Sequence, residues 1–218
     1  MSAENIPIQI QDRDNVLVAD EGIEWRYGKR PDYSGTNKTL RAQSEKHHPT
    51  GSLEAIAQNL VRTFEMEATY KLNPNQWTSV DIHQFRMRTN HGPEYTVQDI
   101  IERGTYNLFL GETPVYSSKA EDFESGAASF MNAFKTGFVW EVIEAYSGPP
   151  RVIFKWRHWG THQGEFKGHA PTNKLIEVYG ITIADVNADL KLTYVEHFFD
   201  NSQFLEKLVS GGKCPMHG

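Results

Sequence analysis

The chain has 218 residues, 39% of them hydrophobic, which is enough to bury the core of one domain with elaborations. Its formal net charge is -6 and Lys and Arg form no run, which argues against a nucleic-acid-binding surface. It has no apolar run that would span a bilayer, no signal-peptide pattern and a single cysteine, Cys214, so we expect a soluble cytoplasmic protein without an internal disulfide.

Residues 1–50 are polar, carry scattered aromatic residues and show no sustained period. We expect them to form an irregular N-terminal arm that packs on the rest of the chain. Residues 51–209 then make up the predicted domain, and residues 210–218 a flexible C-terminal tail.

Three helices are predicted in the first half of the domain. Ser52 is a suitable N-cap for an apolar stripe at helical spacing that runs from Leu53. A second helix is expected from Thr96, with Asp99 completing a capping box. A third is expected from near Ser118 to a stop at Gly137, where glycine typically ends a helix.

After Gly137 the hydrophobic period changes from about 3.6 to 2, which indicates strands. The predicted strands are 138–146, 151–159, 175–186 and 190–199, and the short connections make neighbouring strands antiparallel. A last helix is expected from Asn201 to Gly211. Helices followed by an antiparallel sheet predict the α+β class, with the helices on one face of the sheet.

Periodicity also identifies polar residues that should face inward from the helices. Glu67 lies seven residues after Leu60 and continues its buried stripe, and Tyr70 follows on nearly the same side. On the second helix Asn107 lies seven residues after Ile100. A polar group on an apolar stripe is more often hydrogen-bonded structure than catalytic machinery, so each is a candidate only.

The strands supply two further candidates. Trp156 and His158 share a face opposite Lys155 and Arg157, so His158 is predicted to point inward. In the last strand the alternation of residues places Glu196 on the predicted inward face, together with Leu190, Leu192, Tyr194 and Phe198. Glu141 and Glu144 lie on opposite faces of a regular strand, and either one is a candidate for the interior.

Glu67, His158 and Glu196 together predict a polar cavity suited to acid–base chemistry, because a buried carboxyl has a raised pKa and an imidazole can share its proton. We assign His158 as general base, Glu196 as its orienting partner acid and Tyr70 as a hydrogen-bond donor to a developing enolate. His162 and His169 follow in a glycine-rich connection and are expected at the cavity rim or in solvent.

Five stretches together resemble the plant and fungal pathogen-related proteins of the SnoaL-like group: GSLEAIAQNLVRTFEME (51–67), FVWEVIEAYSGPP (138–150), FKWRHWG (154–160), FKGHAPT (166–172) and VEHFFD (195–200). The resemblance implies an NTF2-like fold, a curved antiparallel sheet wrapped around three to four helices to form a cone with an internal cavity. It also implies a first strand near residues 77–89.

The same resemblance implies a cofactor-free acid–base enzyme of cyclase, isomerase or dehydratase type that acts on a small hydrophobic oxygenated molecule such as a polyketide. His158, Glu196 and His197 are the best counterparts of the acid–base residues of polyketide cyclases, whereas Phe199 stands where a carboxylate would be expected. The expected ligand-binding residues are Trp156, Asn107, Tyr194, His197, His169 and Phe198.

The sequence also allows two alternative functions, and it predicts one assembly state. The first alternative is a binding protein that carries a small apolar ligand without chemistry. The second is haem binding through the thiolate of Cys214 in the Cys-Pro pair of the tail. A homodimer is expected through the outer sheet face, where Ile153 and Trp159 are apolar.

Overall fold

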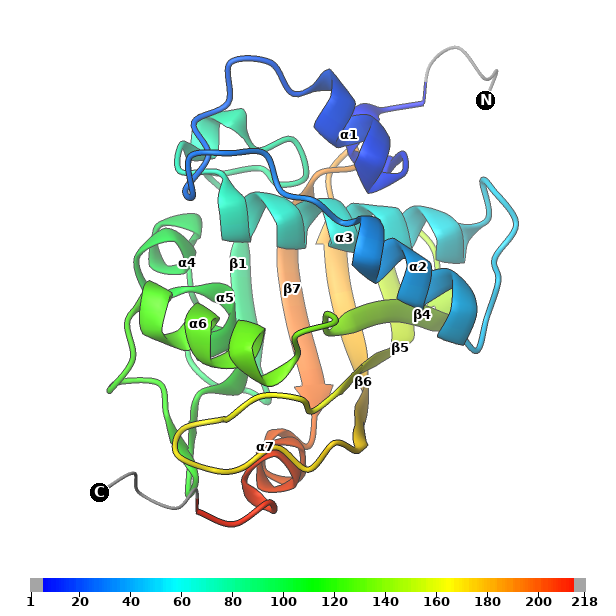
Figure 1. Ribbon diagram of the computed structural model, residues 1–218. Helices are drawn as coiled ribbons and strands as arrows, with labels where there is room; N and C mark the ends of the chain where they lie inside the picture. Colours follow the sequence, from blue (N-terminus) through cyan, green and yellow to red (C-terminus); the bar gives the residue numbers. More distant parts are fainter. Residues whose placement is uncertain (1–5, 214–218) are drawn as a thin grey trace.

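The computed structural model describes residues 6–213, and its centre is one curved five-stranded sheet (Figure 1). The strands are β1 (Arg86–Thr89), β4 (Val139–Ser147), β5 (Arg151–Thr161), β6 (Leu175–Val186) and β7 (Leu192–Phe199), in the order β1-β7-β6-β5-β4. All neighbours are antiparallel except β1, which pairs with β7 in parallel. Two short strands, β2 (Glu112–Thr113) and β3 (Tyr116–Ser117), form a separate hairpin. The expected α+β class is confirmed.

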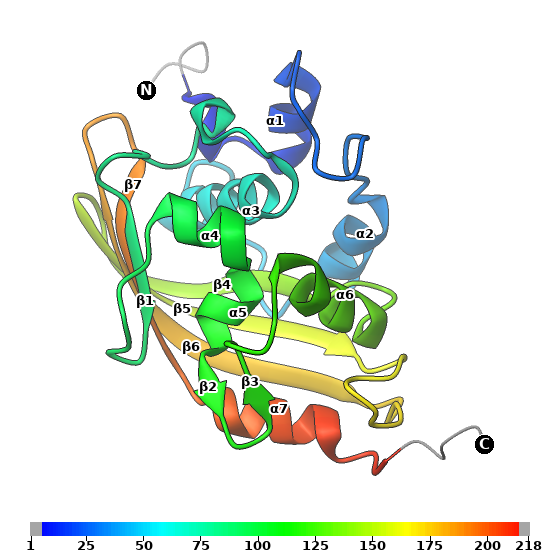
Figure 2. The same ribbon diagram turned by 90° about the vertical axis from the view of Figure 1, so that its left-hand side faces the viewer.

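Helices cover the inner side of the sheet (Figure 2). They are α3 (Leu53–Tyr70), α4 (Val97–Arg103), α5 (Thr105–Leu110) and α6 (Phe123–Ala133), while α7 (Asn201–Val209) packs against β6. Ser52 caps α3 as predicted, because its side chain accepts the Ala55 N–H. None of the helices within residues 6–213 is both long and apolar enough to cross a membrane.

Two of the predicted helices have different bounds in the structure. The helix expected from Thr96 is two helices, because Gly104 has a φ of 84° and separates α4 from α5. The helix expected from near Ser118 to Gly137 is shorter at both ends: it begins at Phe123, capped by Asp122 in a capping box with Ser125, and ends at Ala133. Ser118 instead donates a hydrogen bond to Glu112. Of the region implied to hold a first strand, only Arg86–Thr89 forms one.

The N-terminal arm contacts α3 and β4, and it is more regular than the sequence indicated. It contains a 3-10 turn, η2 (Ile8–Ile10), and two helices, α1 (Arg13–Ala19) and α2 (Ser34–Gln43) (Figure 1). Val16 and Leu17 of α1 pack with Met66 of α3 in a small apolar cluster. Helices this short show too few turns for a clear periodic stripe, so their stability comes from these tertiary contacts.

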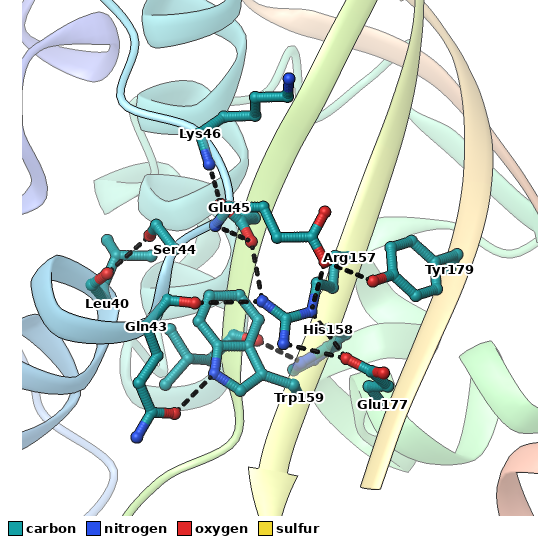
Figure 3. A network of polar contacts seen from close by, with 12 residues as sticks. Leu40, Gln43, Ser44, Glu45, Lys46, Arg157, His158, Trp159, Glu177 and Tyr179 are labelled. Atoms are coloured by element: carbon teal, nitrogen blue, oxygen red, sulfur yellow. Dashed lines mark hydrogen bonds and ion pairs between the residues drawn. The ribbon is translucent and has the colours of Figure 1, made fainter. Parts of the chain in front are cut away.

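The end of the arm continues onto the outer face of the sheet (Figure 3). Arg157 donates to the Gln43 carbonyl oxygen at 3.1 Å and forms an ion pair with Glu177 at 2.9 Å. Trp159 is fully buried and donates from Nε1 to the Gln43 side chain. The predicted outward direction of these β5 residues holds, but the arm covers Trp159, which therefore offers no free apolar surface to a second chain.

Both candidate glutamates of β4 lie on this outer face. Glu141 pairs in register with Arg157, and its carboxylate accepts the backbone N–H groups of Glu45 and Lys46 at 3.1 and 3.3 Å. The register shifts between Val142 and Glu144, and Glu144 stands opposite Lys155. This β-bulge adds one residue to β4 and turns Glu144 to the same side as Glu141.

Candidate functional site

A cavity of about 210 Å³ lies between the inner face of the sheet and the helices. Its walls come from α1, α2, α3, α5, α6 and from β4, β5 and β7. Apolar and aromatic side chains form most of the wall, among them Val61, Phe64, Phe109, Phe130, Phe134, Phe138 and Trp140. The polar and titratable residues in it are Arg13, Tyr33, Thr36, Arg62, Glu65, Thr69, Tyr70, Thr105, Tyr106, His158 and His197. An apolar cavity with a few convergent polar groups is typical of a small-molecule site.

His158 lines this cavity from β5, in agreement with the predicted inward face. Its Nδ1 lies 3.0 Å from the carbonyl oxygen of Val139. A carbonyl only accepts, so Nδ1 carries the hydrogen and Nε2 is left as an acceptor. Burial lowers the pKa of His158 to about 3, which keeps the ring neutral, and Phe138 stacks on it at 3.7 Å.

His197 lines the cavity from β7 and presents the opposite tautomer. The Trp156 indole donates to Thr182 Oγ1 at 2.8 Å, and the same oxygen lies 2.8 Å from His197 Nδ1. Thr182 is buried, and its hydroxyl has no other acceptor within residues 6–213, so we assign its hydrogen to the bond with Nδ1 and the hydrogen of the neutral His197 ring to Nε2. Burial lowers its pKa to about 4. Trp156 thus orients His197 from behind the cavity wall.

Glu65 is the carboxyl group that lines the cavity within residues 6–213, and it is not among the site residues predicted from the sequence. It lies on α3, and its one ion pair within residues 6–213 is with Arg13, whose Nη1 is 4.0 Å from Glu65 Oε2. Desolvation in the cavity wall raises the pKa of Glu65, whose side chain is 34% exposed, against the opposing effect of the cations Arg13 and Arg62. A carboxyl group with a raised pKa in an apolar cavity is suited to both giving and taking a proton.

Tyrosines supply further hydrogen-bond donors to the cavity. Tyr70 lines it as predicted, and burial raises the pKa of its phenol, so the O–H stays protonated. Tyr106 of α5 stacks on Phe130 at 4.4 Å, and burial raises the pKa of its phenol as well. Neither phenol ionises near neutral pH.

Glu67 is fully buried as predicted but lies outside the cavity. Its carboxylate pairs with Lys71 at 3.1 Å and accepts the backbone N–H groups of Thr78 at 2.7 Å and Ser79 at 3.0 Å. With its acceptor sites occupied, Glu67 ties α3 to the following loop, and the general acid–base role expected for it has no geometric support.

Asn107 is likewise buried but does not reach the cavity. Its amide donates to the Asp122 carbonyl oxygen at 2.8 Å and accepts the Tyr116 hydroxyl. A Cβ at Gly126 would lie 2.6 Å from its oxygen, so Asn107 packs directly on α6. It joins α5, β3 and α6 instead of contacting a ligand.

The predicted face of β7 is wrong from Tyr194 onward. Leu192 pairs with Val186 and Tyr194 with Asp185, so β7 contains one extra residue at this point. This β-bulge keeps Leu192 in the core but turns Tyr194, Glu196 and Phe198 outward and His197 inward. A one-residue insertion exchanges the two faces of a strand.

Glu196 therefore belongs to a cluster on the outer face. Its carboxylate accepts from Arg88 at 2.9 Å and from the Tyr194 hydroxyl at 2.9 Å, and His91 Nδ1 lies 3.1 Å away. His91 also contacts Phe198 edge to face. None of these residues lines the cavity, which removes Glu196 as the partner of His158 and Tyr194 and Phe198 as ligand contacts.

The two loop histidines are also away from the cavity. His162 is fully buried, contrary to the expected rim position, and its Nδ1 accepts the Thr172 N–H at 3.3 Å. His169 is half-buried in a bridge with Phe166 and does not reach the cavity wall as a ligand-binding residue. Cys214 lies outside the described residues. Among the residues the structure describes, no three His, Cys, Asp or Glu side chains are grouped to hold a metal ion.

Comparison with known proteins decides the family. No protein-family model matches the chain. A pathogen-related protein from barley, Hordeum vulgare, is 35% identical over 206 residues, which cover 88% of each chain. The chain belongs to the pathogen-related protein family. The family expected from the five sequence stretches is thus confirmed.

Solved structures similar to this pathogen-related protein share little sequence with it. A protein with a ketosteroid isomerase-like fold from Catenulispora acidiphila is 14% identical, with a TM-score of 0.39 over 72% of this chain and 93% of that one. An NTF2-like protein from Burkholderia thailandensis is 12% identical, with a TM-score of 0.40 over 68% and 93%.

Of the residues predicted for the site, the structure brings His158, Tyr70 and His197 to the cavity and leaves the others outside it. Glu65 was hidden because it lies beside the apolar stripe of α3, not on it. A sequence signal for it does exist: Val61, Glu65 and Thr69 are spaced by four, form one row along the helix and all line the cavity.

Proposed function

We propose that this protein is a cofactor-free acid–base enzyme that acts on a small hydrophobic oxygenated molecule in the cavity. The observation that carries the proposal is the position of Glu65, a carboxyl with a raised pKa, in the same aromatic-lined cavity as two neutral imidazoles. The reaction class is proton transfer at a carbon next to a carbonyl, which includes cyclisation, isomerisation and dehydration.

Each polar group has a role that follows from its protonation state. Glu65 in its ionised form takes the proton from carbon and later returns it. The Nε2–H of His197 donates to the oxygen that becomes negative, and it needs no positive charge to do so. The free Nε2 of His158 accepts a hydroxyl hydrogen of the substrate and fixes its orientation.

The test uses exchange of carbon-bound hydrogen, because this step is measurable without knowledge of the final product. A panel of enolisable aryl ketones and 1,3-diketones is incubated with the protein in deuterated water, and deuterium incorporation is followed by NMR. The wild type is expected to accelerate exchange of at least one member. Glu65→Gln should lower that rate by about 10²- to 10⁴-fold, the usual contribution of a general base.

Glu196→Gln is the matched control, since Glu196 is a glutamate of the opposite sheet face that does not line the cavity. Its exchange rate should stay within a factor of two or so of the wild type, as expected for a site without contact to the substrate. Equal rates for Glu65→Gln and wild type, or no acceleration of any panel member by the wild type, would overturn the proposal.

A second candidate function is a carrier that binds a small apolar molecule without chemistry. It is favoured by the low pKa values of His158 and His197, about 3 and 4, which make both rings weak bases at neutral pH. Native mass spectrometry of freshly purified protein identifies a retained ligand, and NMR of that compound after incubation with the protein distinguishes the two functions. A carrier leaves the NMR spectrum of the compound unchanged, whereas an enzyme changes it even when isomerisation leaves the mass the same.

A further inference from the structure

Arg13 occupies the part of the cavity wall contributed by α1, and it has few partners. Its side chain is only 4% exposed. Nη2 lies 3.4 Å from Asn37 Oδ1, Nη1 lies 4.0 Å from Glu65, and Nε has no hydrogen-bond partner in the described part of the chain. A guanidinium group offers five N–H donors, so most of the hydrogen-bonding capacity of Arg13 is unused.

The position of this guanidinium is well defined. Its Cζ lies 3.3 Å from the centre of the Tyr33 ring, so one face of the cation rests on an aromatic side chain. The helix that carries Arg13 is anchored by Val16 and Leu17 in the cluster with Met66. Arg13 is thus held in the cavity wall by the packing of its helix on α3 and of its guanidinium group on Tyr33.

The nearby acidic side chains are already engaged with other groups. Asp12 pairs with Arg62 at 3.5 Å. Asp14 accepts from the Asn37 amide at 2.8 Å, and Asn37 Oδ1 accepts from Arg62. Among the acidic side chains of residues 6–213, this leaves Arg13 only the long contact with Glu65. A buried charge without a close partner is costly, which indicates that a partner arrives with the ligand.

We propose that the ligand of this cavity carries a carboxylate group that binds Arg13, so that the substrates are small aromatic carboxylic acids. The guanidinium edge fits a carboxylate with two parallel hydrogen bonds, and the aromatic wall fits a planar hydrophobic body. The inference rests on the proposed function for the location of the site, but it is tested by binding alone.

The experiment compares acids with their uncharged isosteres. Phenylacetate, cinnamate and benzoate are titrated against their primary amides by calorimetry and by intrinsic tryptophan fluorescence, to which Trp140 of the cavity wall contributes. The wild type should bind at least one acid about tenfold or more tightly than the matching amide. Arg13→Gln should abolish this preference and leave the affinity for the amide unchanged, while Arg13→Lys should keep part of it.

Arg26→Gln is the matched control, because Arg26 also lies on an aromatic ring, 3.5 Å from the centre of Phe123, but outside the cavity. It should keep the full preference for the acid. The proposal is overturned if no acid in the panel binds the wild type more tightly than its amide, or if Arg13→Gln retains the preference. Loss of amide binding in both Arg13 variants also overturns it, since Arg13 would then only hold the arm in place.

The outcome is independent of the proposed reaction. A preference for acids that depends on Arg13, together with unchanged hydrogen exchange in Glu65→Gln, would refute the enzyme function and leave the carboxylate site intact. Loss of exchange in Glu65→Gln, together with equal binding of acids and amides, would support the enzyme function and refute the carboxylate site.

Discussion

Burial acts on the ionisable side chains of the cavity in the direction that removes their charge. It raises the pKa of Glu65 and lowers the pKa of His158 and His197. Burial lowers the pKa of Arg62 to about 10, so this side chain stays charged at neutral pH, and Arg13 has fewer hydrogen-bond partners than Arg62 within residues 6–213. The polar part of the cavity therefore contains neutral donors and acceptors next to a cation, a combination suited to an acidic ligand.

The raised pKa of Glu65 predicts a pH-dependent effect on stability. A carboxyl whose folded-state pKa exceeds its unfolded value contributes stability that is fully present below the unfolded pKa, about 4.3, and is lost as the pH rises through the folded value. Glu65→Gln cannot ionise, so it should be more stable than the wild type at pH 8 and equal to it near pH 3.5. Urea unfolding at a series of pH values measures the difference.

Glu196→Gln is the control of opposite sign in the same experiment. Burial disfavours the charge of Glu196, but the hydrogen bonds from Arg88 and Tyr194 outweigh it and lower the pKa. That stability is present above the unfolded pKa and is lost as the pH falls through the folded value. Glu196→Gln should therefore be less stable than the wild type at pH 8 and approach it in acid. A stability difference for Glu65→Gln that does not change with pH would contradict the role of burial.

At the scale of elements, long regular segments follow from the sequence and single-residue irregularities do not. α3 and the strands β5 and β6 have enough residues for a clear period, so the start of α3, the bounds of β6 and the inward face of β5 were predictable. The bulge near Thr193 inserts one residue, and no residue type there marks it. Because of that insertion, His197 lines the cavity wall where the strand period predicts Glu196.

The break between α4 and α5 depends on Gly104, which adopts φ 84° and ψ 144°. A side chain there would be strained, and its Cβ would lie 3.2 Å from the Phe123 ring. We expect Gly104→Ala to lower the free energy of unfolding by about 1–3 kcal/mol, the usual cost of such a conformation for a residue other than glycine. Thermal and urea unfolding would measure it.

Gly35→Ala is the control for this substitution, because Gly35 is helical in α2 and a Cβ there would meet no atom within 4 Å. It should leave stability unchanged or raise it by about 0.5–1 kcal/mol through the better helix propensity of alanine. If the two alanine variants were equally stable, the helix break would not require glycine.

At the scale of the whole molecule, the arm and the body share one site. The arm supplies Arg13 and Tyr33 to the cavity wall on one side of the sheet, and Glu45 and Lys46 bind Glu141 on the other. The sequence predicted that the arm packs on the body, but a polar segment without a period does not indicate which of its residues reach a cavity. Those contacts join residues far apart in the chain.

This arrangement predicts that the arm stays bound after its peptide connection is cut. Thr50 and Gly51 lie in an exposed turn between the arm and α3, where a protease recognition sequence can be inserted. After cleavage we expect residues 1–50 to co-elute with the body on a sizing column at protein concentrations of about 1 µM, which requires a Kd at or below that value. Both pieces should separate in urea.

The cavity provides the second readout of the same experiment. The cleaved complex should retain the acid-over-amide preference of the intact protein, because Arg13 stays in the wall, and the body isolated after urea should lose it when refolded alone. Adding the arm fragment back should restore the preference. The contrary result is that the arm dissociates on the native column and the body alone keeps its preference for acids. The cavity would then be complete without Arg13, and the arm would have no part in ligand binding.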